Sequence, residues 1–251
     1  MTADVTLAGV FMHGSSSTPD TPDADGVVWN VSSLAGWDAA PERIDDGETT
    51  GRHGGFGSPR LYAPRPLTLS GWCDCPSMAA AFAVRDRLHT LKAGELIVSE
   101  PTPKAVTVVS GGAPRSDWPL EGPTPVVEWM ISLVALDPFK RSLTPRTTVV
   151  GAGATVAAVN DGTAAADLVV TLTSPGTVVL SAGGVTLTTG SLPAGAVIDT
   201  GATTVRVSPS GSSLFHLVTM PALWPALPAG GGSIQQAGTA GLSIEHFDTY
   251  A

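Results

Sequence analysis

The second half of the sequence is a series of short apolar runs separated by turns rich in glycine and proline. The runs lie at residues 155–159, 168–172, 178–180, 185–188, 196–199, 204–207, 213–218 and 242–246. Each run is too short for a stable helix, and alternation between apolar and polar side chains is typical of strands that bury one face. Their regular spacing predicts an antiparallel β-sandwich.

The first half combines strands with one helix. Residues 76–92 predict a helix with Pro76 at its first position, Gly94 after its end, and an apolar stripe through Met78, Phe82, Leu88 and Leu91. Four runs predict strands, at residues 67–72, 95–99, 105–110 and 126–136. The last run is apolar on both faces, which indicates a strand covered on both sides.

Charge is distributed unevenly along the chain of 251 residues, which carries 13 basic and 22 acidic side chains. Residues 146–251 hold only seven of these, namely Arg146, Arg206, Asp161, Asp167, Asp199, Glu245 and Asp248. A change in composition beside Pro138 and Pro145 indicates a boundary. We therefore predict a mainly β protein with two domains, at residues 1–145 and 146–251.

Net charge and hydropathy exclude several partners. The net charge is −9 and no basic run occurs, so non-specific binding to nucleic acid or to an anionic membrane is not expected. The mean hydropathy of +0.22 is high, yet no apolar run reaches the length of a membrane span. The acidic start, Met1 to Asp4, does not resemble a secretory signal. Extensive subunit interfaces would explain the apolar surplus.

Motifs for catalysis and metal binding are missing from the sequence. Cys73 and Cys75 stand two apart on a predicted strand, where a disulfide would be strained, so we expect two thiols. No Walker, dinucleotide-binding, Gly-x-Ser-x-Gly or His-Glu-x-x-His motif occurs. We therefore expect no enzyme activity, no metal and no cofactor.

Two long segments show no clear periodicity, at residues 12–26 and 36–61. Long loops in a compact domain are usually functional or flexible. Residues 52–57 are rich in glycine and could cradle an anion with their amides. The alternative, that this stretch orders against a neighbouring chain, is favoured because no nucleophile and base accompany it.

Several motifs occur together in one order along the chain. They are Gly36-Trp37-Asp38, Tyr62-x-x-Arg65-Pro66-Leu67, Asp137-Pro138-Phe139, Asn160-Asp161-Gly162, Pro193-Ala194-Gly195 followed by Ile198-Asp199-Thr200, and Leu223-Trp224-Pro225 followed by Gly230. This order resembles the distal tail protein family of long-tailed siphophages, in the form of the minor tail proteins of actinobacteriophages. The likeness covers essentially the whole chain.

The resemblance implies a fold and a function. The first domain would be a tail-tube-like β-sandwich with one flanking α-helix, and the second a galectin-like antiparallel β-sandwich. Six copies would form a ring that joins the tail tube to the tip complex and lets DNA pass. The implied partners are further copies of the chain, the tail-tube protein, the tail-tip hub protein, and receptor-binding or other minor tail proteins. The implied location is the virion tail tip, after synthesis in the host bacterial cytoplasm.

Ring contacts are expected from the segment 36–61. The candidates are Trp37, Asp38, Arg52, His53, Phe56 and Arg60. A ring needs a heterologous interface, in which one patch meets a different patch on the next copy. Two alternatives stay open. One is a tail-tube subunit that stacks into tubes, and the other is a carbohydrate-binding module that uses Asn160, Arg206, His216, Trp224 and Glu245.

Overall fold

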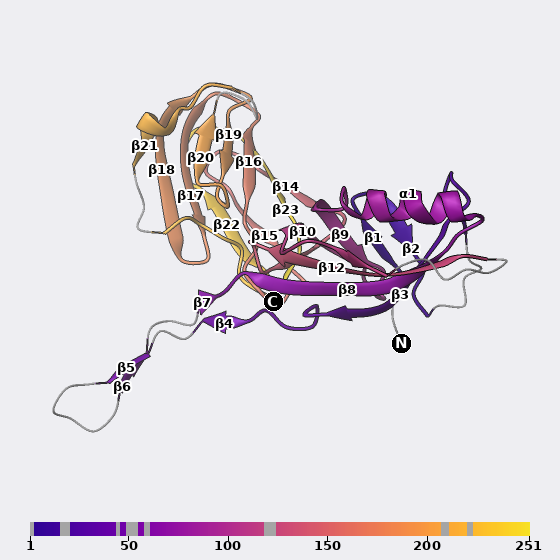
Figure 1. Ribbon diagram of the computed structural model, residues 1–251. Helices are drawn as coiled ribbons and strands as arrows, with labels where there is room; N and C mark the ends of the chain where they lie inside the picture. The colour runs from indigo at the N-terminus through magenta and orange to yellow at the C-terminus, as the bar shows by residue number, and fades with distance from the viewer. Residues whose placement is uncertain are drawn as a thin grey trace. The chain divides into compact units, whose positions relative to one another are not determined.

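The computed structural model describes residues 3–15, 21–43, 46–48, 55–57, 61–117, 124–206, 211–219 and 223–251 (Figure 1). The chain divides into two compact units, residues 1–140 with Ala251 and residues 141–250. Strands dominate both units, and α1 is the one α-helix in the described ranges. The predicted mainly β fold with a single helix is confirmed.

Unit 1 is built on one large antiparallel sheet with the strand order β2-β1-β9-β10-β12-β8-β3. Its strands are β1 (Val5–Leu7), β2 (Val10–Met12), β3 (Val28–Ala35), β8 (Arg65–Asp74), β9 (Ala93–Val98), β10 (Lys104–Ser110) and β12 (Val126–Ala135), with β11 (Arg115–Ser116) paired to β12. The two edge strands of this sheet, β2 and β3, come together. The evidence is a bridge between His13, which follows β2, and Asn30 in β3. A single hydrophobic core fills the space inside.

The two longest strands, β8 and β12, pair along their full length from Val126–Asp74 to Ala135–Arg65. Side chains alternate strictly between the core and the outer face on both strands. On β8, Leu67 and Leu69 point inward, while Ser70 and Trp72 point outward. The outward positions of both strands are exposed or half-buried.

The helix α1 (Met78–Leu88) is shorter than predicted. Ser77 caps it by accepting a hydrogen bond from the Ala80 amide, so Pro76 precedes the cap instead of opening the helix. The predicted stripe was wrong at Phe82, whose side chain is 42% exposed. The buried positions of the helix are Ala81, Val84 and Leu88. Gly94 lies in β9 and not at the helix end.

Unit 2 consists of two five-stranded antiparallel sheets around a second core. One sheet has the order β14 (Arg146–Val150), β23 (Leu242–His246), β16 (Val169–Leu172), β19 (Val197–Asp199) and β20 (Thr204–Arg206). The other has the order β15 (Thr155–Ala158), β22 (Gly232–Gln236), β17 (Gly176–Ala182), β18 (Val185–Leu192) and β21 (Val218–Thr219). The short β13 (Lys140–Ser142) pairs with β24 (Thr249–Tyr250). The predicted strand 213–218 is wrong, because a 3₁₀ turn, η1 (Phe215–Leu217), precedes β21.

Both cysteines are buried free thiols, as expected. Burial raises the pKa of Cys75 to about 11 and raises that of Cys73 further. Within the described ranges, no helix has the length and apolar character that a membrane crossing requires.

Candidate assembly surface

Most of the segment that was expected to make ring contacts, residues 36–61, lies in an arm, defined here as residues 39–63. In the arm, β4 (Glu42–Arg43) pairs with β7 (Leu61–Tyr62), and β5 (Asp46–Glu48) pairs with β6 (Gly55–Gly57). Neither pair belongs to the large sheet. Figure 1 shows the two pairs one after the other, beyond the Arg65 end of β8. The arm therefore carries its backbone pairing away from the body of unit 1.

The chain leaves β3 for the arm through a tight turn at Gly36. Its φ of +84° lies in the left-handed region, and a Cβ atom there would lie 2.1 Å from the Pro66 carbonyl oxygen. Only glycine fits such a close approach of two backbones. The first position of the motif Gly36-Trp37-Asp38 therefore has to be glycine.

Trp37 anchors the base of the arm to unit 1. Its side chain is only 5% exposed, and its indole Nε1 donates to Glu100 Oε1. The other oxygen of Glu100 is 2.7 Å from Lys104 Nζ. Burial opposes ionisation of Glu100, yet hydrogen bonds from Lys104 and Trp37 hold its pKa below the usual value. The carboxylate is therefore charged at neutral pH and receives the indole firmly.

Two buried cations hold the backbone on either side of Trp37. Arg65 is fully buried, and its Nη1 donates to the carbonyl oxygens of Trp37 at 2.6 Å and Gly36 at 3.3 Å. Lys140 is 5% exposed, and its Nζ donates to the carbonyl oxygens of Trp37 at 3.0 Å and Asp38 at 3.2 Å. We call Trp37, Arg65, Glu100 and Lys140 the clamp.

The two cations of the clamp, Arg65 and Lys140, are buried away from solvent. Burial lowers the pKa of Arg65, and burial together with the nearby Arg65 lowers the pKa of Lys140. Arg65 Nη2 is buried and has no hydrogen-bond partner within the described part of the chain. The ammonium of Lys140 also lies 5.1 Å from the centre of the Trp37 ring, a favourable cation–π distance. The three carbonyls at the arm's base are thus fixed by charge-assisted bonds.

Apolar side chains at the base of the arm remain exposed. Leu61 is 51% exposed and Tyr62 is 39% exposed. The Tyr62 ring packs edge-on against the Phe139 ring, with the ring centres 5.1 Å apart. Exposed apolar residues on a projecting element suit a contact with another chain.

The predicted contact residues fall in different places. Trp37 is buried at the base of the arm and Asp38 beside it is exposed. Phe56 lies in β6, and its side chain is outside the described part, as are Arg52, His53 and Arg60. The interface role of all six residues stays a prediction.

Sequence reasoning missed the clamp cations. Arg65 occupies an inward position of β8, since it shares the parity of Leu67 and Leu69. The alternation of β8 could therefore have predicted that Arg65 is buried. Lys140 had no such signal, because it follows Pro138 in a connection without periodicity.

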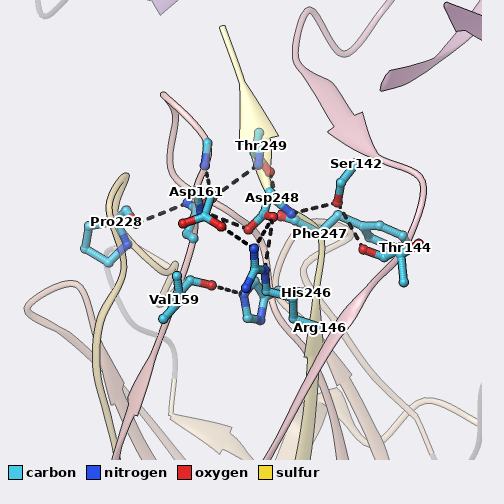
Figure 2. Close-up of polar contacts among 12 residues, drawn as sticks. Ser142, Thr144, Arg146, Val159, Asp161, Pro228, His246, Phe247, Asp248 and Thr249 are labelled. Atoms are coloured by element: carbon cyan, nitrogen blue, oxygen red, sulfur yellow. Dashed lines mark hydrogen bonds and ion pairs between the residues drawn. The ribbon is translucent and has the colours of Figure 1, made fainter. Parts of the chain in front are cut away.

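A polar network organises the loops at one end of unit 2 (Figure 2). Arg146 donates to Asp248 through Nε at 3.0 Å and Nη2 at 2.9 Å, and it also pairs with Asp161. Asp248 in turn accepts from the Asp161 amide, and His246 Nε2 lies 2.9 Å from the Val159 carbonyl oxygen. The network joins the C-terminal strands to the turn after β15.

Asn160 lies at the centre of this turn and is fully buried. Its Nδ2 donates to the carbonyl oxygens of Ala164, Leu227 and Pro228, and its Oδ1 accepts from the amides of Gly162 and Thr249. The Asn160-Asp161-Gly162 motif is thus explained by backbone packing.

The structure does not bring the sugar-binding candidates together. Asn160 is buried, and Glu245 on β23 is three strand positions from Arg206 on β20, which is about 14 Å. His216 lies in η1, and Trp224 stacks on Phe215 with ring centres 6.3 Å apart. No single sheet face carries the whole set.

This chain resembles known proteins in its structure. No family model matches the chain, and no curated protein matches its sequence. The crystal structure of the Dit protein of phage SPP1 matches with a TM-score of 0.59, over 88% of this chain and 93% of that one, at 14% identity. The two proteins share a fold. SPP1 Dit is described as a paradigm of the hub of the adsorption apparatus in phages that infect Gram-positive bacteria.

A second match comes from the baseplate of phage P2 in its activated conformation with calcium. It has a TM-score of 0.52 and 8% identity, and it covers 90% of each chain. Both matches cover most of this chain. At these identities the likeness establishes a shared fold, while membership of the distal tail family and the actinobacteriophage form remain predictions.

Proposed function

We propose that this chain is a structural distal tail protein at the tail tip of a long-tailed phage. Six copies form a ring that joins the tail tube to the tip complex and leaves a passage for DNA. The observation that carries the proposal is the fold shared with SPP1 Dit over 88% of the chain. The projecting arm and its clamp support it, since they provide an element suited to contact with a neighbouring copy.

The role is assembly and not catalysis. The partners are the other copies of the chain, the tail-tube protein, the tip hub protein, and receptor-binding or other minor tail proteins. The negative net charge suits a wall beside passing DNA, because like charges repel the phosphate backbone.

The test is native mass spectrometry of the full chain, with negative-stain images of the same sample. Discrete hexamers or dodecamers with a central hole would support the ring. Long tubes would indicate a tail-tube subunit, and a chain that binds glycans as a monomer would indicate a carbohydrate-binding module.

The arm is tested by replacing residues 42–62 with a short Gly-Ser linker. The ends can be joined easily, because the Ala63 amide donates to the Pro41 carbonyl oxygen at 2.8 Å. We expect a folded monomer that no longer forms rings. Rings that persist in this arm-deleted chain would contradict the assignment of the ring contact to the arm.

A further inference from the structure

A groove of about 590 Å³ lies on the outer face of the unit 1 sheet. Its floor is formed where β8 pairs with β12, with Trp72 opposite Glu128 and Asp74 opposite Val126. The Trp72 side chain is 38% exposed, although most tryptophans of unit 1 are buried. Asp117 borders the groove from the segment after β11.

The groove is lined by three carboxylates, Asp74, Asp117 and Glu128, and by one guanidinium. Asp74 accepts a hydrogen bond from Asn30 Nδ2 at 3.0 Å. Asp117 and Glu128 are exposed, and their backbones are joined by a 3.1 Å hydrogen bond. Arg115 is the basic residue of the lining. Three carboxylates around one indole form a surface that favours a cationic and aromatic ligand.

The chain itself contains a segment of complementary composition. Residues 49–60 carry Arg52, His53 and Arg60, together with Phe56, and they contain no acidic residue. In a chain with a net charge of −9, this stretch is unusual. Arginine pairs with carboxylates through two parallel hydrogen bonds and also stacks on aromatic rings, so it matches both parts of the groove.

The arm and the groove lie at opposite ends of the same strand. The arm connects to β8 at Arg65, whereas the groove is built around Trp72, seven residues on, which corresponds to about 23 Å of extended strand. The paired strands of the arm lie beyond the first end of β8 (Figure 1). The groove lies toward the other end of this strand. A copy of the chain thus presents one patch at each end, as a heterologous, head-to-tail contact requires.

We propose that the groove around Trp72 receives residues 49–60 of a second copy of the chain. This proposal rests on the proposed function, because it names the surface at which one copy of the ring meets the next. Arg52 and Arg60 pair with Asp117 and Glu128 across the contact, and Phe56 packs on Trp72.

The experiment compares four charge variants of the full chain by native mass spectrometry over a concentration series. The arm variant is R52E with R60E, and the groove variant is D117K with E128K. The third variant combines all four substitutions. The control variant, D86K with E245K, changes the net charge as the groove variant does but at exposed residues elsewhere.

We expect the arm variant and the groove variant each to raise the concentration at half assembly by at least about tenfold, because like charges then face one another. The combined variant should recover assembly, since the attraction is restored with reversed signs. The control should assemble as the wild-type chain does. Circular dichroism of each variant verifies that it is folded.

Three outcomes would overturn the proposal. If the groove variant assembles normally while the arm-deleted chain does not, the arm docks elsewhere and the proposed function stands. If the groove and control variants weaken assembly equally, the effect is one of net charge. If the wild-type chain remains monomeric at every concentration, both this docking and the self-assembled ring fail.

Discussion

The substitution Asn160→Ala should unfold unit 2 at a much lower denaturant concentration or temperature. The side chain is fully buried and makes five hydrogen bonds to the backbone of three separate segments. Two of its acceptors keep another donor, because the Ala166 amide bonds to Leu227 and the Gly231 amide bonds to Pro228. The Ala164 carbonyl and the amides of Gly162 and Thr249 lose the partner that Asn160 provides.

The magnitude follows from these three groups. A polar group left without a partner in the interior costs about 1–3 kcal/mol, and water reaches the partly buried ones at lower cost. We therefore expect a loss of about 2–4 kcal/mol in the free energy of unfolding of unit 2. That corresponds to a fall of roughly 10–15 °C in its melting temperature. Differential scanning calorimetry of the full chain would resolve the transition.

Two matched variants sharpen the test. Asn160→Asp keeps the oxygen that accepts hydrogen bonds but replaces the Nδ2 donor with a second oxygen. That oxygen would face the carbonyl oxygens of Ala164, Leu227 and Pro228, which also only accept, so this variant should destabilise unit 2 at least as much. Asp161→Ala removes a largely exposed neighbour and should cost about 1 kcal/mol or less. A loss below about 1 kcal/mol for Asn160→Ala would refute the reasoning, since buried bonds of this kind should not be dispensable.

Three further predictions concern unit 1. Trp37→Ala should lower its free energy of unfolding by about 3–5 kcal/mol, because the buried indole leaves a cavity, whereas Asp38→Ala at an exposed position should change it by less than about 0.5 kcal/mol. Chemical denaturation measures both, and equal effects would contradict the different burial of the two residues. Burial opposes ionisation of Asp23, but hydrogen bonds from Val27, Trp29 and Arg87 lower its pKa below 3.8. The stability from this carboxylate is therefore complete above about pH 4 and is lost as the pH falls through the lower folded pKa, so Asp23→Asn should flatten the acid limb of a stability–pH curve. Cys73 and Cys75 are buried with raised pKa values, so a maleimide should leave them unmodified at neutral pH in the native chain and modify both in urea; rapid native labelling would show that unit 1 opens readily.

Local patterns predicted the helix and many of the strands, but not β1, β2, β3, β14 or β22. Alternation with a period of two identified β8, β12, β16 and β23, since the side chains of a strand that buries one face must alternate. The helix was found, but its buried stripe was misjudged at Phe82. Periodicity shows that a helix has an apolar side and does not show how closely a sheet will approach it.

The segment 36–61 shows where local patterns are insufficient. Its glycine-rich composition indicated a loop, yet it contains two paired sets of strands, because pairing across the arm supplies the hydrogen bonds that its propensities do not favour. The expectation that this segment makes ring contacts came from its turn-rich sequence and from the family resemblance, and it stays a prediction. The clamp that holds it was not.

The sequence by itself determined that the chain is a mainly β protein with one helix, because strand alternation and helix periodicity depend on residues close together in the chain. Only the tertiary structure decided which polar residues lie inside and what they hold. Lys140 reaches the Trp37 carbonyl across 103 residues, Arg65 reaches Pro138 across 73, and Asn160 reaches Thr249 across 89. A buried cation or amide is stable only where distant backbone groups converge on it, and that convergence is a property of the folded chain.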